Sequence, residues 1–464
     1  MQPSNPTDRI RTLDLIRGVA VLGILAVNVA GFAAPDSAVY SPDMPRAGVW
    51  QDHAAWLFTF VLFEGKMRAL FSVLFGASLL LFVERADAAG RNGARLQTRR
   101  LAWLMVFGYL HFALIWDGDI LFLYGAIGFA ALAVRSWRPV QLVTAAALVL
   151  ALWQVWGAAM WLPSVATEAA VTSGTASAAV QKQHAADLAQ YRAEDAKDVA
   201  EAKLSWPAQV KAKWTDRGDD PVNLIAYNWG ETLPWMLLGM ALLRSGFFAG
   251  AWPRRRMVWL ASAGIGLGGA VTIAFALWAS RAHYPEVTMH FATSFGLALP
   301  HLAMALGYAA LLVLASERWA SSSPLPQAAG AALSSPLPLA GGVGGGPIPE
   351  TPLTNAPTPN PSRKREGDSA LRRLFEVLRQ QIEAAGRMAF SNYLGTSLVM
   401  AALCYGWGLR LLGQFGAAQR WTLVLLVWAL ILSWSQPWLT RYRQGPLEWL
   451  WRSLTEWRVL RFRR

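Results

Sequence analysis

The feature that most limits the fold of this chain is a series of long apolar blocks separated by short basic tracts. Hydrophobic residues make up 54% of the 464 residues and charged residues only 15%, whereas a soluble chain carries about a quarter charged residues. Several blocks reach the roughly 20 residues that a helix needs to cross a bilayer. Because lipid cannot satisfy the backbone of isolated strands, the blocks predict an all-α, polytopic membrane protein.

The blocks predict about ten transmembrane helices. They are expected at residues 13–34, 55–83, 101–116, 120–134, 139–162, 224–248, 257–280, 290–316, 388–411 and 421–440. The second block is interrupted by Glu64-Gly65-Lys66-Met67-Arg68, so it is either one long tilted helix or a broken one. Lys and Arg gather in alternate loops, and the positive-inside rule therefore places both termini in the cytoplasm.

The net charge of +13 has two readings, nucleic-acid binding or membrane topology. The basic residues lie in short tracts between apolar blocks, which favours topology, and no nucleic-acid partner is expected. The single cysteine, Cys404, lies within an apolar block and excludes a disulfide or a thiolate metal cluster within one chain.

Two long polar stretches divide the spans into regions. The stretch from 178 to 213 is rich in Ala, Gln, Glu, Asp and Lys, which favours a helix outside the membrane. Residues 320–368 are rich in Pro, Gly, Ala and Ser, which predicts disorder. The expected regions are a bundle of five spans (1–162), an outer helical excursion (163–222), three spans (223–316), a cytoplasmic linker with an amphipathic helix at about 369–385 (317–385), and two spans with a basic tail (386–464).

Ionisable side chains at membrane depth are costly and are therefore candidate functional residues. Asp14 and Arg17 are three residues apart, so they share a helix face and are expected to pair, as a structural ion pair or as part of a site. Asn28 lies about three turns beyond Arg17, near the same face, where its amide could orient a substrate or bridge helices.

Three charges interrupt the second block: Glu64, Lys66 and Arg68. They must face protein or a water-filled cavity rather than lipid. A pair of cations in a cavity suits an anionic ligand such as a phosphate or carboxylate. Lys66 and Arg68 are therefore candidate substrate-binding residues, and Glu64 a supporting one.

His111 is the candidate catalytic base. It lies in the third span, and Asp117-Gly118-Asp119 follows at the turn into the fourth. A carboxylate can fix the tautomer of a histidine and support its protonated form, which assigns Asp119 as its partner and Asp117 as support. The alternatives are a packing role for His111 and an N-cap role for Asp119.

Other polar residues in the later spans suggest packing. Gly264-Ile265-Gly266-Leu267-Gly268-Gly269 has the form of a dinucleotide-binding loop, but it lies in a transmembrane block and indicates close helix packing. Glu231 lies in a span that Pro234 is expected to kink. His290 and His301 are three turns apart, too far for one metal site, and no metal is expected.

Several motifs resemble those of the YeiB-like family of bacterial inner-membrane proteins, over nearly all of the chain except 163–222 and 320–368. They are Arg9-Ile10-Arg11-Thr12-Leu13-Asp14-Leu15-Ile16-Arg17-Gly18 leading to Asn28, Phe63-Glu64-Gly65-Lys66-Met67-Arg68, Gly108-Tyr109-Leu110-His111 leading to Trp116-Asp117-Gly118-Asp119, Gly386-Arg387 leading to Asn392-Tyr393, and Gly445-Pro446-Leu447-Glu448-Trp449-Leu450-Trp451-Arg452. The N-terminal half is similar to heparan-glucosaminide acetyltransferase-like membrane enzymes.

This resemblance implies a multi-pass acyltransferase of the bacterial inner membrane. Acyl-CoA would be the co-substrate, an envelope glycan or lipid-linked sugar the acceptor, and the lipid bilayer the remaining partner, with no bound cofactor. A histidine is central to the related enzymes; His111 is the candidate here and His53 its rival. The distribution of Lys and Arg described above, with both termini inside, would place the excursion at 163–222 in the periplasm.

Two other functions fit the same residues. In a transporter or flippase of a small anionic or lipid-linked solute, the charges would line a pathway without covalent chemistry. In a scaffold, the excursion would contact envelope partners. The enzyme hypothesis expects Arg17, Lys66, Arg68, His111 and Asp119 around one cavity open to both faces, formed by the first four helices, with the later helices as support.

Overall fold

The computed structural model describes residues 11–322 and 362–464, and within these ranges its regular elements are helices. The helices are α1 (Arg11–Ala33), α2 (Trp50–Leu62), α3 (Lys66–Ala88), α4 (Gly93–Leu114), α5 (Leu121–Ala133), α6 (Pro139–Thr172), α7 (Ala178–Ala202), α8 (Trp206–Asp216), α9 (Asp220–Arg244), α10 (Arg254–Arg281), α11 (Glu286–Phe291), α12 (Ala298–Ser322), α13 (Ser362–Arg387), α14 (Ala389–Cys404), α15 (Ala417–Arg441) and α16 (Pro446–Glu456). The linker expected to be disordered lies mostly outside the described residues.

Six stretches of the described chain are long and apolar enough to cross a membrane. They are α1, α2 with α3, α6, α10, most of α12, and α15. Helices α5 and α14 are apolar but shorter, with 13 and 16 residues. The expected count of about ten therefore depends on these two short helices and on α4 and α9, which carry charged residues.

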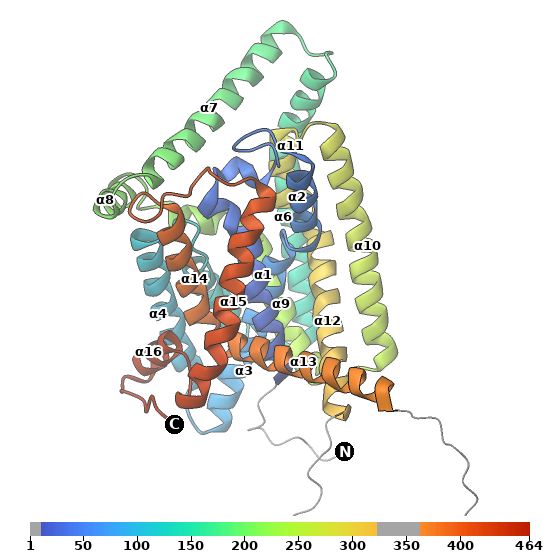
Figure 1. The fold of residues 1–464 in the computed structure, drawn as a ribbon, viewed down its shortest axis with the longest axis vertical. Coiled ribbons are helices and arrows are strands. Elements are labelled where there is room, and N and C mark those ends of the chain that lie inside the picture. The colour runs from blue at the N-terminus through green and yellow to red at the C-terminus, as the bar shows by residue number, and fades with distance from the viewer. Residues whose placement is uncertain (1–10, 323–361) are drawn as a thin grey trace, which may run out of the picture.

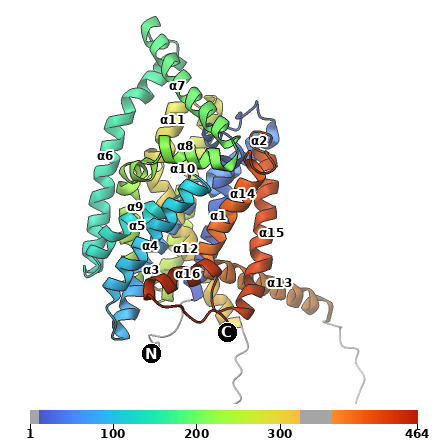
Figure 2. The same cartoon turned by 90° about the vertical axis from the view of Figure 1, so that its left-hand side faces the viewer.

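The long helices run side by side, with α1 inside the bundle (Figures 1 and 2). Helices α13 and α16 lie across one end, and α7 and α8 cover the other (Figure 1). The N-terminal turns of α1 pack on α13, where the backbone of Gly18 meets Ile382 and that of Gly386 meets Asp14. We call the end with α13 and α16 the inner end and the end with α7 and α8 the outer end.

The block at 55–83 is a broken helix. Helix α2 ends at Leu62 and α3 begins at Lys66, and Gly65 between them has a φ of 71°, which a residue with a Cβ adopts only under strain. The Lys66 ammonium donates a 2.8 Å hydrogen bond to the carbonyl oxygen of Phe60. A backbone acceptor that the break leaves open is thereby satisfied.

The span expected at 290–316 is also interrupted. A π-helical turn at Ala292–Gly296 separates α11 from α12, and the two interrupted segments meet where the ring of His301 packs against Gly65. Such turns are rare and often mark functional sites.

The glycine motif at 264–269 joins helices, as expected. A Cβ on Gly264 would lie 2.4 Å from the carbonyl oxygen of Ala303, and one on Gly268 would lie 2.9 Å from that of Pro300. Helices α10 and α12 therefore approach at backbone distance. The motif is a packing surface.

The expected helix outside the apolar blocks is present as α7 and α8. Helix α6 runs ten residues beyond the predicted end at 162, to Thr172, and carries this excursion away from the bundle (Figure 1). The excursion then folds back onto the outer end, where the Trp206 indole donates to the carbonyl oxygen of Leu114 at 2.8 Å. The excursion thus forms a cap over the end of α4.

Candidate functional site

His111 and Asp119 form a buried pair at the outer end of α4. The Nδ1 atom of His111 lies 2.8 Å from Oδ1 of Asp119, and both side chains are almost fully buried. The other carboxylate oxygen of Asp119 accepts a 2.9 Å hydrogen bond from the backbone N–H of Phe122 in the first turn of α5. Asp119 therefore caps α5 and orients His111 at the same time.

The backbone makes room for this pair at Gly108. A Cβ at that position would lie 2.7 Å from Oδ2 of Asp119 and 2.2 Å from the nitrogen of Phe122. Any larger residue would push α5 away from α4. Gly108 is therefore required for the contact between His111 and Asp119.

The second ring nitrogen of His111 is unoccupied. Nε2 is buried and has no hydrogen-bond partner within the part of the chain that the structure describes. Because Asp119 accepts from Nδ1–H, Nε2 carries the lone pair and can accept a proton. The rival His53 differs: its Nδ1 lies 2.9 Å from the Tyr284 hydroxyl and its Nε2 lies 3.3 Å from Asp43.

A cavity of about 230 Å³, here called the inner cavity, lies on the inner side of this pair. Residues of α1, α3, α4, α5, α13, α14 and α16 line it. Its walls include Ile120, which follows Asp119, and Tyr393, whose ring lies 5.5 Å from that of His111. One aromatic ring therefore separates the cavity from the histidine.

The inner end of the cavity is cationic. A second space of about 350 Å³ shares Arg17, Ser78 and Arg100 with the inner cavity. We call its five arginines the arginine vestibule: Arg17, Arg85, Arg91, Arg100 and Arg452. One carboxylate, Glu456, also lines it, and it pairs with Arg91 at 2.5 Å. The excess of positive charge suits an anionic ligand.

Aromatic rings hold Arg100 in place. Its guanidinium lies 4.1 Å from the ring centroid of Phe82 and 4.3 Å from that of Trp451. Stacking of this kind fixes the plane of a guanidinium without neutralising its charge. Arg100 is therefore presented to the cavity as a positioned cation.

Arg17 also lies in the vestibule, and its expected pair with Asp14 is present at 3.1 Å. Its second nitrogen donates to the hydroxyl of Ser78 at 2.9 Å. Asn28 lies eleven residues further along α1, about 16 Å toward the outer end, and lines neither the inner cavity nor the vestibule.

Lys66 and Arg68 do not line the inner cavity. The expectation that one cavity is surrounded by Arg17, Lys66, Arg68, His111 and Asp119 was therefore wrong. Lys66 bonds to the Phe60 carbonyl, as described above, and Arg68 pairs with Glu231 of α9 at 3.1 Å. The break in the helix turns both cations toward groups of the bundle itself. Periodicity could not reveal this, because Glu231 is more than 160 residues away in sequence.

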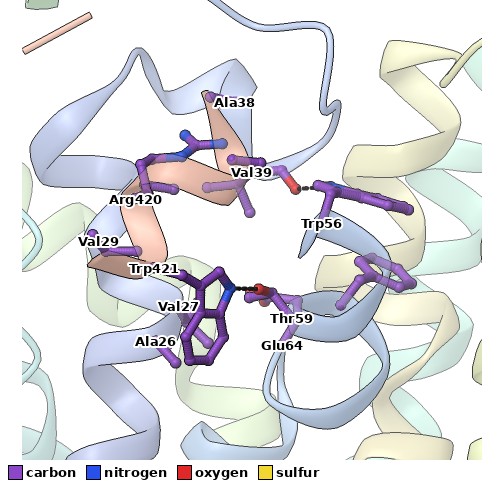
Figure 3. Close-up of a pocket in the computed structure, with 13 residues that line it drawn as sticks. Ala26, Val27, Val29, Ala38, Val39, Trp56, Thr59, Glu64, Arg420 and Trp421 are labelled. Atoms are coloured by element: carbon purple, nitrogen blue, oxygen red, sulfur yellow. Dashed lines mark hydrogen bonds between the residues drawn. The ribbon is translucent and has the colours of Figure 1, made fainter. Parts of the chain in front are cut away.

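Glu64 lines a third, smaller cavity between α1, α2 and α15 (Figure 3). Figure 3 shows it near Trp421, whose indole donates to the hydroxyl of Thr59 at 3.0 Å. The volume of about 40 Å³ holds little more than a water molecule. Arg420 also borders this cavity.

Asp117 belongs to an ionic cluster at the outer end. The Arg217 guanidinium lies 3.2 Å from Asp117, 3.0 Å from Asp198 and 2.7 Å from Asp220. Burial raises the pKa of Asp198, although Arg217 acts to lower it. Burial acts to lower the pKa of Arg217, but the surrounding carboxylates, Asp117 first, raise it overall. The cluster ties the cap to the turn that carries Asp119.

The C-terminal helices contribute to the cavity, which sequence reasoning missed. The Glu448 carboxylate lines it and accepts hydrogen bonds from the backbone N–H groups of Phe390 (2.8 Å) and Ser391 (3.0 Å). The Trp451 indole donates to the carbonyl oxygen of Arg100 at 2.9 Å. The inner cavity is therefore not formed by the first four spans alone, although the His111–Asp119 pair comes from the third span and the turn after it. The sequence signal that could have revealed this role is the motif at 445–452, which contains Glu448 and Trp451.

In comparisons with known proteins, the chain is similar to proteins of bacteria. Residues 242–331 and 370–458 match the model described as "Protein of unknown function (DUF418)". The chain is 27% identical to "Uncharacterized protein YxaH" of Bacillus subtilis (strain 168), over 98% of this chain and 96% of that protein. It is 29% identical to "Uncharacterized protein YeiB" of Escherichia coli (strain K12), over 97% and 96%. No solved structure matches the chain.

Proposed function

The chain belongs to the YeiB-like family, and we propose that it is a membrane-bound acyltransferase of the bacterial inner membrane. It would move an acyl group from cytoplasmic acyl-CoA to an envelope glycan or a lipid-linked acceptor. The observation that carries this proposal is the buried His111–Asp119 pair, whose free Nε2 lies one ring away from a cavity with a cationic mouth.

The proposed topology has ten crossings with both termini in the cytoplasm. The arginine vestibule and the three arginines 254–256 lie at the inner end of the bundle. Arginine-rich loops stay in the cytoplasm, so the inner end faces acyl-CoA and the cap over α4 faces the periplasm.

His111 would act as the general base. Once the ring of Tyr393 has moved from between His111 and the cavity, Nε2 takes the proton from the acceptor hydroxyl as the oxygen attacks the thioester carbonyl carbon. The bond between carbon and sulfur breaks, and the leaving thiolate receives that proton from Nε2. Asp119 holds Nδ1–H throughout and stabilises the transient imidazolium. In a variant of this route, His111 carries the acyl group itself.

The cavity offers separate places for the two parts of the donor. The arginine vestibule suits the phosphates of the donor, because guanidinium groups bind phosphate oxygens in a planar, bidentate way. The walls above it are apolar and aromatic, including Phe71, Phe75 and Leu104, which suits an acyl chain. The thioester would lie between them, on the His111 side of the cavity.

A transporter or flippase is the second candidate. The observation that favours it is the pair of interrupted segments, α2–α3 and α11–α12, which meet inside the bundle. Interrupted helices of this kind form the central sites of many transporters. Here a small anionic or lipid-linked solute would cross without any covalent step.

Purified full-length protein in liposomes, supplied with radiolabelled acetyl-CoA, tests the enzyme proposal. Release or transfer of the labelled acyl group should fall by about 10²–10⁴ in His111→Ala, because the general base is lost. His53→Ala is the matched control and should keep the wild-type rate, since both nitrogens of His53 are engaged elsewhere. Equal rates in His111→Ala and wild type would reject the assignment. Solute flux without acyl release would favour the transporter.

A further inference from the structure

A second group of ionisable side chains lies inside the bundle, away from the inner cavity. We call it the buried charge cluster: Glu64, Lys66, Arg68, Glu231 and His301. Its centre is the ion pair between the Arg68 guanidinium and Oε2 of Glu231, at 3.1 Å. His301 of α12 is within electrostatic reach of both Lys66 and Arg68. Nothing in the proposed acyl transfer uses these residues.

Several polar atoms of the cluster have no partner among the described residues. Oε1 of Glu231, Nε of Arg68 and both ring nitrogens of His301 are buried and make no hydrogen bond to any described residue. Most buried polar groups in folded proteins are satisfied, so four open atoms in one place require an explanation such as a bound water or a functional role. Both donors and acceptors are open, which suits protons and water.

The backbone around the cluster is arranged to admit His301. A Cβ on Gly65 would lie 2.0 Å from Nδ1 of the His301 ring, and the positive φ of Gly65 brings the backbone to that position. On the other side, the carbonyl oxygen of Thr293, in the π-helical turn, lies 3.5 Å from the Arg68 guanidinium. Both helix interruptions therefore serve the same group of charges.

The charges of the cluster balance. Lys66 and Arg68 are positive, Glu64 and Glu231 are negative, and a neutral His301 leaves no net charge for an ionic solute to compensate. The hydroxyl of Tyr124, from α5, donates to the backbone oxygen of Arg68 at 3.4 Å. Tyr40, from the loop after α1, is an electrostatic neighbour of Glu64 and Arg68. A proton can bind to this balanced set because the carboxylate of Glu231 can itself change from charged to neutral.

Arg68 is the more exposed partner of its ion pair with Glu231. Its side chain is 32% exposed, whereas that of Glu231 is 4% exposed. A charged side chain inside a membrane bundle normally faces a water-filled path rather than lipid. We infer that the exposed part of Arg68 faces such a path.

We propose that Glu231, within the buried charge cluster, is a proton-binding site separate from the His111–Asp119 pair. A proton from water forms an O–H bond at Oε1 of Glu231. Neutral Glu231 no longer attracts Arg68, and the cluster then carries one net positive charge. Proton uptake is thereby linked to the contact between α3 and α9, which the Arg68–Glu231 pair joins.

Infrared difference spectra of the full-length protein in nanodiscs, between about pH 5 and about pH 8, test this site directly. A carboxylic acid band should appear on acidification and be lost in Glu231→Gln. Glu168→Gln is the matched control: Glu168 is equally buried, but three hydrogen bonds from Val287 and Thr288 hold its carboxylate, so the band should persist.

Two further measurements keep the test decisive. Glu231→Asp retains a carboxyl group, so the band should remain and move in frequency even if Glu231→Gln does not fold. A dye-based pH jump should show about one proton less taken up per chain in Glu231→Gln than in wild type. A band that is absent in wild type, or unchanged by both substitutions of Glu231, would overturn the proposal. Neither readout involves acyl transfer, so failure of one proposal leaves the other standing.

Discussion

Asp119→Asn is the substitution that most sharply tests how the His111 pair works. Asp119 accepts one hydrogen bond at each carboxylate oxygen, from His111 Nδ1 at 2.8 Å and from the Phe122 N–H at 2.9 Å. Asparagine has nearly the same shape but only one acceptor oxygen. The Phe122 N–H can only donate, so the amide oxygen is expected to face it and the amide NH₂ to face His111.

This orientation reverses the histidine tautomer. An NH₂ group facing Nδ1 requires a lone pair there, so the ring proton moves to Nε2. Nε2 then becomes a donor and can no longer accept a proton from a substrate. The rate of acyl transfer should fall by about 10²–10⁴, which corresponds to a barrier increase of about 2.7–5.4 kcal/mol.

The same change should cost less in stability than in rate. One charge-assisted hydrogen bond is replaced by a neutral one, while the cap on Phe122 is kept, so the free energy of unfolding should fall by about 1–3 kcal/mol. Asp117→Asn is the matched control in the same turn. Its partner Arg217 retains Asp198 and Asp220, so stability should change by less than about 1 kcal/mol, with the rate unchanged.

The tautomer can be observed directly. The chain has six histidines, so ¹⁵N-histidine labelling gives few signals, and His111→Gln identifies those of His111. The wild type should show a protonated Nδ1 and Asp119→Asn a protonated Nε2. A wild-type tautomer together with a wild-type rate in Asp119→Asn would refute the reasoning.

Three further predictions concern the donor site, the broken helix and the cap. Arg100→Gln should raise KM for acyl-CoA about tenfold with little change in kcat. The difference in KM between the variant and the wild type should shrink at high salt, because the lost interaction is electrostatic. Initial rates at two ionic strengths check this. Gly65→Ala should lower the thermal unfolding temperature, because the added Cβ would lie 2.0 Å from His301 and the residue would keep a φ of 71°. Gly395→Ala is the control: its Cβ would meet no atom within 4 Å, so the substitution should be neutral or stabilising by up to about 1 kcal/mol. Arg217→Gln should speed proteolysis between α6 and α7, because the ionic tie of the cap to Asp117 is lost; Lys197→Gln, which breaks only an exposed pair with Glu201, should leave the cleavage rate unchanged.

The pair of His111 and Asp119 could be predicted from the chain because it is local. Eight residues separate the two side chains, and one tight turn joins their helices, so few geometries are available. The pair of Asp14 and Arg17 could be predicted for the same reason, since both lie on one face of α1. Contacts of this kind follow from helix geometry alone.

The partners of Lys66 and Arg68 could not be predicted in this way. The motif at 64–68 shows that charges lie inside an apolar block, but it does not show their partners. Lys66 bonds to Phe60 across a helix break, and Arg68 pairs with Glu231 of α9. The role of the C-terminal motif was hidden similarly, because Glu448 and Trp451 reach the inner cavity only after the chain has returned from α15. These contacts depend on which helices become neighbours.

The sequence by itself determined that this protein is helical and built for a membrane, because long apolar blocks have no other stable structure in lipid. It also determined which side chains need an explanation, since charges inside such blocks are costly wherever they lie. Only the tertiary structure decided how these charges are grouped. It divided one expected cavity into the inner cavity below His111, the arginine vestibule and the buried charge cluster, because helix packing, and not spacing along the chain, sets which distant side chains meet.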